Sequence, residues 1–197
     1  MHIQAKDKNP AVKLCADLKP ELYINGSISH GTDFDPDHGG LTCELQLVAG
    51  ENWELLSDGA TFQTHISFPC RRTKEYVWSQ SFETLYAPSS IEGWPSGILK
   101  VWKFDEANKL DIIAYCKFIV PLEPGYHEIQ CHTWTPIGDA KSSDLAYYFG
   151  NYPRIRDISH VVFNDDKLKY LKTAGNGTVY LNLNVIRRNF GPRVDKN

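Results

Sequence analysis

Residues 91–115, IEGWPSGILKVWKFDEANKLDIIAY, constrain the fold more than any other stretch of the chain. Two apolar runs, 98–104 and 110–115, lie on either side of a short polar loop, and Gly93-Trp94-Pro95 forms a rigid lead-in to the first run. Runs rich in β-branched and aromatic residues that are separated by a short polar loop are typical of antiparallel hairpins. The stretch therefore predicts the central hairpin of a β-sandwich.

Further strands are predicted on both sides of this hairpin, because apolar residues alternate there with polar ones. Alternation is clearest at 41–48 and 178–186, and weaker strands are predicted at 21–30, 53–56, 61–68, 76–86 and 126–134. Asp58-Gly59 predicts a hairpin turn between 53–56 and 61–68. A short helix is predicted at 142–149, with a serine cap and a terminal Gly150. The sequence thus predicts an all-β, antiparallel sandwich of about eight strands with one short helix.

Length and composition restrict the class of protein. The 197 residues suffice for one well-buried domain, which we expect at 21–191, with an extension at 1–20 and a tail at 192–197. A net charge of -3 gives no overall attraction to nucleic acid. The N-terminus lacks the apolar segment of a signal peptide, and no stretch reaches the roughly 18–20 apolar residues of a membrane span. Five cysteines without a CxxC pair suit a reducing compartment, so we expect a soluble, cytosolic protein.

The loop at 31–40 carries Asp33, Asp35 and Asp37 at alternate positions, followed by Glu44 at the twelfth position from Asp33. Carboxylates with this spacing begin the calcium loop of an EF-hand. The EF-hand interpretation fails, because His38 occupies the glycine position and the flanking segments are predicted strands. The three aspartates are therefore weak metal candidates, and a solvated acidic loop is the commoner case.

A second acidic loop contains Asp105 and Asp111. Its surroundings, VWKFDEANKLDIIAY, resemble the third calcium-loop region of C2 domains, in which these two residues match ligand aspartates. Lys103 occupies the first ligand position, and Ala114 replaces the usual glycine. A lysine ammonium at a ligand position repels the cation and removes a carboxylate. The resemblance therefore implies a C2-like fold, and the lysine argues against calcium; we expect no metal and no cofactor.

No catalytic constellation is apparent in the sequence. The seven histidines show neither HxxxH nor HExxH spacing, and there is no nucleophile elbow and no glycine-rich phosphate loop. We therefore expect no enzymatic activity. Arg71, Arg72 and Lys74 form a basic cluster that could contact anionic lipid headgroups, although solvated surface is the commoner case for such residues.

Partner binding is the alternative to catalysis. Trp94, Trp134 and Phe190 lie at or just beyond predicted strand ends, where aromatic residues often anchor interfaces. For the two tryptophans, a role in closing the ends of the core is equally consistent with the sequence. Arg187 and Arg188 close the last predicted strand, where their guanidinium groups could form bidentate contacts with carboxylates of a partner.

Several motifs together resemble one family. They are Ile91-Glu-Gly-Trp-Pro, Val101-Trp102, Pro121-x-x-Pro-Gly-x-His, Cys131-x-Thr-Trp-x-Pro-Ile-Gly, and the C-terminal run from Thr173 to Phe190. In this order and over residues 21–191, they resemble the B9 domain family, a C2-like group.

The resemblance implies a non-catalytic structural subunit of the Meckel syndrome module, a tectonic-like complex at the ciliary transition zone. The expected partners are B9 domain-containing protein 1 and the Meckel syndrome type 1 protein, with membrane-spanning tectonics as indirect partners. The implied location is the cytoplasm and cytoskeleton at the cilium base, including the basal body and axoneme, where the complex supports ciliogenesis and gates membrane-protein entry. A peripheral lipid-binding module, independent of calcium or weakly dependent on it, is the alternative.

Overall fold

A computed structural model describes residues 19–35, 39–104, 109–137, 155 and 171–191. All regular secondary structure in these residues is β. The nine strands are β1 (Glu21–Thr32), β2 (Gly40–Val48), β3 (Trp53–Leu55), β4 (Thr61–Gln63), β5 (Tyr76–Pro88), β6 (Ser96–Phe104), β7 (Leu110–Ile119), β8 (Gly125–Pro136) and β9 (Thr173–Arg188).

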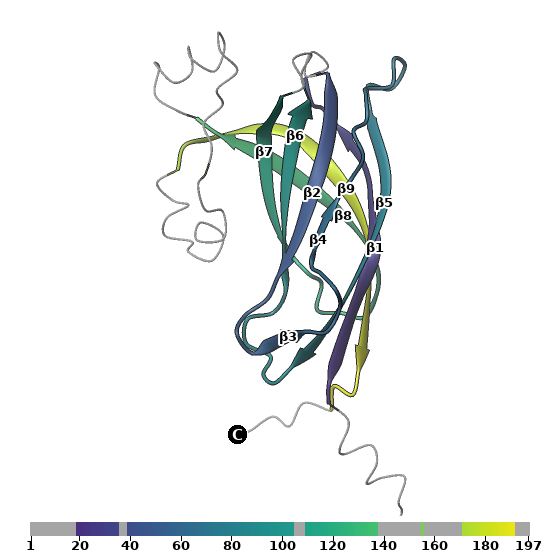
Figure 1. Cartoon of the computed structure of the whole chain (residues 1–197), viewed down its shortest axis with the longest axis vertical. Coiled ribbons are helices and arrows are strands. Elements are labelled where there is room, and N and C mark those ends of the chain that lie inside the picture. The colour runs from purple at the N-terminus through teal and green to yellow at the C-terminus, as the bar shows by residue number, and fades with distance from the viewer. Residues whose placement is uncertain (1–18, 36–38, 105–108, 138–154, 156–170, 192–197) are drawn as a thin grey trace, which may run out of the picture.

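The strands form one antiparallel sheet in the order β3-β5-β1-β9-β8-β7-β6-β2-β4. The sheet curls, so that β2, β6 and β7 lie across from β1, β5 and β9 (Figure 1). β7 and β8 share a single residue pair, Tyr115 with Trp134, and the sheet passes from one layer to the other at this point. The result is the all-β sandwich that the sequence predicts.

The core lies between the two layers and is built from alternate side chains of each strand. Its buried members include Leu22, Ile24 and Ile28 of β1, Leu181, Leu183 and Val185 of β9, Leu41, Cys43 and Leu45 of β2, and Leu99 and Val101 of β6. The alternation predicted for 41–48 and 178–186 is therefore confirmed.

Two sequence predictions about strand pairing are wrong. The Asp58-Gly59 turn does not join a hairpin, because β3 pairs with β5 and β4 pairs with β2, at opposite edges of the sheet. The strand predicted at 61–68 is only three residues long, and beyond it a single bridge joins Leu41 to Ser67. The pairing depends on long-range contacts that a local turn signal does not contain. The helix predicted at 142–149 lies outside the described residues.

The predicted hairpin at 98–115 is present as β6 and β7, with an irregularity between Val101 and Trp102. Val101 is opposite Ala114 and Trp102 is opposite Ile112, so Ile113 is an extra residue on β7. Such a bulge shifts the alternation of side chains. Both Ile113 and Ala114 are consequently buried.

The sandwich has two ends that the strand register defines. At the terminal end, β1 begins opposite the last residue of β9, and β3 pairs with the last residues of β5. At the loop end, Gly40 pairs with Phe104 and Gly31 pairs with Tyr76. The two acidic loops and the basic cluster thus share the loop end, and the chain enters and leaves the sandwich at the terminal end.

Candidate partner-binding surface

A series of aromatic rings leads from the core to the surface of the terminal end. Trp53 is buried and meets Tyr86 edge-on, with ring centroids 6.3 Å apart. Trp94 lies edge-on to Trp53, at 5.2 Å, and contacts Phe190, at 6.5 Å. Edge-to-face contacts at these separations add to the stabilisation that burial of the rings provides. Through these ring contacts, the buried core holds the Phe190 ring in place at the surface.

The polar atoms of the two indoles are satisfied within the chain. Trp53 Nε1 donates to the Glu92 carbonyl at 2.9 Å, and Trp94 Nε1 donates to the Val120 carbonyl at 2.8 Å. Because Trp94 is half-buried and hydrogen-bonded, it closes this end of the core. A partner would therefore meet Phe190 and its neighbours before Trp94.

The backbone geometry just before Trp94 requires a glycine at position 93. Its φ is +76°, and a Cβ there would lie 2.6 Å from the Gly50 Cα. The Gly50 N–H donates to the Gly93 carbonyl at 2.8 Å. Only glycine permits both this backbone conformation and this close approach. The contact fixes the β2–β3 connection against the β5–β6 connection and so positions Trp94.

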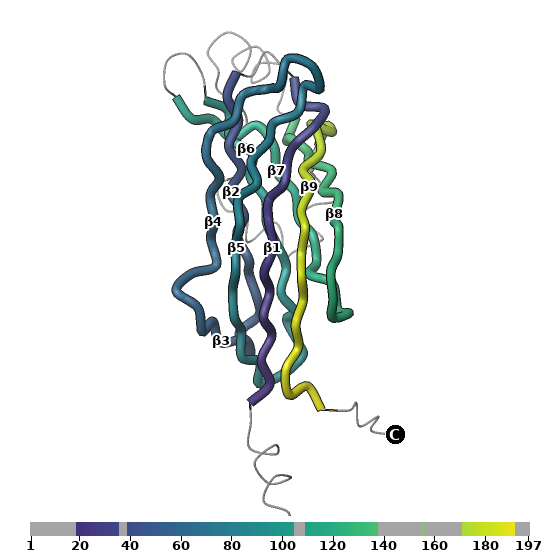
Figure 2. The backbone as a smooth tube through the Cα atoms, turned by 90° about the vertical axis from the view of Figure 1, so that its right-hand side faces the viewer, coloured from purple at the N-terminus to yellow at the C-terminus, as the bar shows by residue number. Residues whose placement is uncertain are grey.

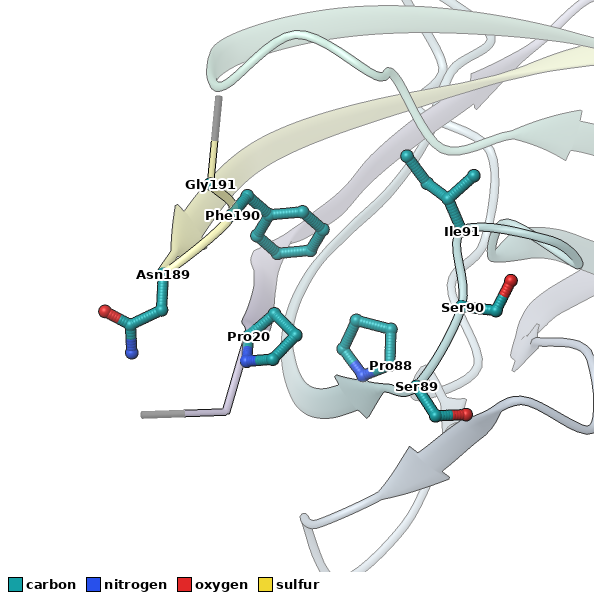
Figure 3. A pocket seen from close by; sticks show the side chains of 8 residues that line it. All are labelled: Pro20, Pro88, Ser89, Ser90, Ile91, Asn189, Phe190 and Gly191. Carbon is teal, nitrogen blue, oxygen red and sulfur yellow. The ribbon is translucent and has the colours of Figure 1, made fainter. Parts of the chain in front are cut away.

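A groove of about 210 Å³ opens beside Phe190 (Figure 3). Three segments that are distant in the sequence form it: the start of β1, the end of β5 with its connection, and the end of β9. Its lining residues are Pro20, Pro88, Ser89, Ser90, Ile91, Asn189, Phe190 and Gly191. The groove lies below the roughly 300–1,000 Å³ of small-molecule sites, so its size suits a single side chain of a partner.

The walls of this groove are mainly apolar, and its polar side chains are engaged within the chain. Ile91 is 57% exposed and borders the groove. Asn189 Nδ2 donates to the Lys19 carbonyl at 3.2 Å, and Ser90 Oγ accepts from the Glu92 N–H at 3.2 Å. The groove therefore offers apolar contact rather than hydrogen bonds to an occupant.

A wider hollow of about 410 Å³ continues from the groove, with which it shares Pro20, Pro88 and Ser89. Its other lining residues are Lys19, Glu51, Asn52, Glu54 and Ala87. Two exposed glutamates thus border the hollow on the side of β3. Together the groove and the hollow give the terminal end an apolar centre with a polar rim, which is the usual layout of a protein interface.

The two predicted arginines lie at the same end but differ in their contacts. Arg187 is exposed, and its guanidinium carbon lies 5.9 Å from the centre of the Phe190 ring, within the range of a cation–π contact. Arg188 Nη1 lies 3.5 Å from Glu21 Oε2, in an ion pair at the surface. A carboxylate of a partner would have to compete with Glu21 for Arg188.

Trp134 does not belong to this surface. It lies on β8 and packs against Tyr115 at a centroid distance of 5.5 Å, in a small cluster that also contains Ile98 and Ile155. The Ile155 N–H donates to Tyr115 Oη at 3.3 Å. The structure therefore brings Trp94, Phe190 and Arg187 together and places Trp134 on the outer side of the β6–β7 layer.

At the loop end, the acidic candidates are separated from one another. Asp33 is exposed with φ +60° and accepts from Thr32 Oγ1 at 3.1 Å, and Asp35 is also exposed. Asp111 is buried, and its Oδ2 lies 2.9 Å from Lys109 Nζ. Asp37 and Asp105 lie outside the described residues.

Asp111 is also the cross-strand neighbour of Lys103. A carboxylate with a lysine ammonium at 2.9 Å already has a cation beside it, and a divalent ion would have to displace that ammonium. Within the part of the chain that the structure describes, no group of three His, Cys, Asp or Glu residues is placed to hold a metal ion.

The basic cluster at the loop end forms an exposed turn. The Lys74 N–H donates to the Cys70 carbonyl at 2.8 Å, and the Cys70 N–H donates to the Glu75 carbonyl at 2.9 Å. Arg71, Arg72 and Lys74 are all exposed, and nearby Phe68 is 64% exposed. Hydrogen bonds from the backbone of Thr73 and Arg72 lower the pKa of the exposed Cys70 thiol.

Sequence reasoning missed most of the groove. Pro20, Pro88 and Ile91 carry no motif that marks them as a site, and only the register of β1, β5 and β9 brings them together. The sequence does contain an aromatic signal, because it predicts Trp94 and Phe190 at strand ends. For Trp53, which joins them to the core, the sequence predicts only a place in a short strand.

These features define a curled β-sandwich with an apolar groove at the end where the chain enters and leaves. The family model B9-C2, described as "Ciliary basal body-associated, B9 protein", matches residues 22–186. The chain therefore belongs to the B9 family, as the motifs predicted, and this is not a known enzyme family.

Similar proteins in other organisms align with nearly the whole domain. B9 domain-containing protein 2 of Danio rerio is 32% identical over 170 residues, which are 86% of this chain and 95% of that protein. The Homo sapiens protein of the same name is 28% identical with the same coverage. "Tectonic-like complex member MKS1" of Rattus norvegicus is 23% identical over 85% of this chain and 33% of its own length.

Among solved structures, a C2 domain of plant extended synaptotagmin 1 has a TM-score of 0.43 and 7% identity, covering 83% of this chain and 92% of that domain. None of the described residues forms a helix that is long and apolar enough to cross a membrane.

Proposed function

We propose that the chain is a non-catalytic structural subunit of the tectonic-like Meckel syndrome complex at the ciliary transition zone. In this role it assembles with B9 domain-containing protein 1 and the Meckel syndrome type 1 protein, with tectonics as indirect partners. The assembly supports ciliogenesis and the gating of membrane-protein entry into the cilium. Its location is the cytoplasm and cytoskeleton at the cilium base, at the transition zone, basal body and axoneme.

The observation that carries this proposal is the groove at the terminal end. Its centre is apolar, its rim is polar, and Phe190 beside Arg187 provides residue types that are enriched at protein interfaces. A pocket of about 210 Å³ receives one side chain rather than a cofactor or metabolite. An assembly subunit needs such an anchor, and it needs no catalytic group.

The comparisons support the ciliary part of the proposal. The matching family model is described as ciliary basal body-associated, and one similar protein is named as a member of the tectonic-like complex. Two members of one family that share a fold can interact through related surfaces.

Affinity purification of the tagged chain from ciliated cells of its own species tests the proposal. We expect the two other B9 proteins to be recovered, and fluorescence from the tagged chain to be confined to the cilium base. A chain that is recovered alone and is absent from the cilium base would contradict the proposal. A Phe190→Ala variant should retain the fold and recover less of both proteins.

A peripheral membrane role is the second candidate, and one observation favours it. Phe68 is exposed close to Arg71, Arg72 and Lys74, so a large apolar side chain and three cations share the loop end. Basic residues near a membrane attract anionic lipids by about 1 kcal/mol each. The two roles are compatible, because a transition-zone complex lies beside a membrane.

Vesicles of phosphatidylcholine with and without phosphatidylserine test the membrane role. Binding should require the anionic lipid, weaken as salt rises, and fall when Arg71, Arg72 and Lys74 are all replaced by alanine. Any calcium dependence should disappear in the Asp105→Asn, Asp111→Asn variant. Equal retention on neutral vesicles, or none on anionic ones, would eliminate this candidate.

A further inference from the structure

The outer face of β5, β1, β9 and β8 is a second surface with an unusual composition. Its side chains alternate with the core residues of the same strands, and the register aligns them in three rows of four. The rows are Tyr126, Asn184, Asn25 and Glu83; then Glu128, Asn182, Ser27 and Ser81; then Gln130, Tyr180, His30 and Val77. We call these residues the Asn face.

The Asn face contains no lysine or arginine, although the chain has 21 of them. Its only charged groups are the carboxylates of Glu83, at the β5 end of the first row, and Glu128, at the β8 end of the second row. Asparagine is a poor strand former, yet Asn25, Asn182 and Asn184 lie next to one another on the two middle strands. Sheet stability therefore does not explain this composition.

A role in partner binding explains the composition of the Asn face better than sheet stability does. Tyrosine, serine and asparagine are among the residues enriched in antibody paratopes, and lysine is depleted from protein–protein interfaces relative to the rest of the surface. Tyrosine gives a large contact area with little side-chain entropy to lose, and asparagine and serine provide adaptable hydrogen bonds. The outward positions of a sheet that only faces water normally carry charged residues of both signs.

Several side chains of the Asn face are already held in place. Tyr23 Oη, in the adjoining row, donates to Glu83 Oε2 at 2.6 Å, and Tyr126 Oη donates to Glu128 Oε1 at 3.2 Å. The rings of His30 and Tyr180 stack with centroids 4.4 Å apart and an interplanar angle of 5°. Side chains that are ordered before binding lose less entropy when a partner arrives.

The face is open and large enough for a stable interface. No described segment lies in front of β5, β1, β9 and β8 in Figure 2, where these strands face the viewer. With the adjoining row on each side, the face measures about 19 Å by 34 Å, or roughly 650 Å², from the usual spacings of strands and residues. Specific interfaces bury about 600–1,000 Å² on each partner, so the area of the face lies at the lower end of this range.

We propose that the Asn face binds a folded protein whose flat surface brings lysine or arginine side chains to Glu83 and Glu128. Charge complementarity selects this occupant. A second copy of the chain that docked through its own Asn face would offer no cation to either glutamate, and an anionic membrane or nucleic acid would be repelled by both. The inference rests on the proposed function, because the partner is a subunit of the same assembly. It also gives the chain two separate binding surfaces, at the terminal end and on this sheet.

Asn182→Arg in the full-length chain tests the proposal, with Thr61→Arg as the matched control. Asn182 is half-buried on the Asn face, and Thr61 is an exposed strand residue that lies on β4 at the edge of the other layer. The probes are purified B9 domain-containing protein 1 and Meckel syndrome type 1 protein from the same species, each titrated separately. Both variants should unfold within about 2 °C of the wild type, since surface substitutions of this kind change stability little.

We expect Asn182→Arg to weaken binding of one of the two proteins at least 30-fold, and Thr61→Arg to change neither affinity more than twofold. Glu83→Lys with Glu128→Lys should weaken the same interaction at least tenfold and reduce its dependence on salt. If wild type binds and Asn182→Arg binds equally well, the inference is overturned and the proposed function survives.

Two other results would also overturn the inference. If the wild type binds neither protein, the proposed function fails, and the inference fails with it. If sedimentation shows that the wild type self-associates and Asn182→Arg does not, the occupant is a second copy of the chain.

Discussion

The terminal end and the loop end of the sandwich use their side chains in opposite ways. At the terminal end, aromatic rings connect the core to an apolar groove, and Ile91 and Phe190 border a cavity that is open to solvent. At the loop end, Asp111 is paired with Lys109 and lies opposite Lys103. The comparison shows a buried carboxylate at the loop end that is paired within the chain, and an apolar groove at the terminal end that is open to solvent.

Loss of the Trp53 ring should have the largest effect on the terminal end. Trp53→Ala removes a buried indole and the support of Trp94, and should lower the free energy of unfolding by about 3–5 kcal/mol. Urea titration followed by far-UV circular dichroism measures the change. Trp53→Phe keeps an aromatic ring and loses the hydrogen bond to the Glu92 carbonyl, so it should cost less. Equal costs for the two variants would show that the ring contacts do not support this end.

The sequence predicts the strands and the aromatic residues of the terminal end, but it does not predict the groove. Alternation at 41–48 and 178–186 was sufficient to predict the strands, because a half-buried strand imposes a period of two wherever it occurs. Trp94 and Phe190 were recognisable as aromatic residues at strand ends. The groove was not, since Pro20, Pro88 and Ile91 meet only through the antiparallel register of distant strands. The wrong hairpin at Asp58-Gly59 has the same origin: the turn is local, and the pairing is not.

The ion pair between Asp111 and Lys109 at the loop end should contribute less to stability than the aromatic contacts of Trp53 do. Asp111→Ala removes a buried carboxylate, but its partner Lys109 is 43% exposed and can be hydrated instead. We expect the free energy of unfolding to fall by about 1 kcal/mol, which is closer to the value of a surface pair than of a buried one. The exposed Asp33 provides the matched control, and Asp33→Ala should cost about 0.5 kcal/mol or less. An Asp111→Ala variant as stable as the wild type would show that the pair contributes nothing.

The surface ion pair between Arg188 and Glu21 at the terminal end should contribute still less to stability. Arg188 and Glu21 are 67% and 33% exposed, and their charged atoms are 3.5 Å apart. Arg188→Ala should therefore change the free energy of unfolding by about 0.5 kcal/mol or less. Thermal unfolding at low and high salt measures this contribution. A loss above about 1 kcal/mol that disappears at high salt would show that charge, and not packing, joins β1 to β9.

Calcium should have the smallest effect on the stability of the fold. A site with a dissociation constant of about 10 µM would gain roughly 2.7 kcal/mol of stability at about 1 mM calcium. Because Lys109 and Lys103 lie beside Asp111, we expect the unfolding temperature to change by no more than about 1 °C. Magnesium at the same concentration controls for ionic strength. A calcium-specific rise in the unfolding temperature that vanishes in the Asp105→Asn, Asp111→Asn variant would show that the loop end binds a ligand, which would contradict the comparison drawn between the two ends.

The affinity of an Ile91→Glu variant for the two other B9 proteins tests most directly whether the terminal end is a partner-binding surface. Ile91 is exposed, so the substitution should leave the fold intact, while a carboxylate buried against the apolar groove of a complex is costly. Leu110→Glu, at an exposed apolar position of the loop end, is the matched control. We predict that Ile91→Glu weakens binding of at least one protein by about 30-fold and that Leu110→Glu changes it less than about twofold. Equal affinities for wild type and Ile91→Glu, or a loss confined to Leu110→Glu, would contradict the account.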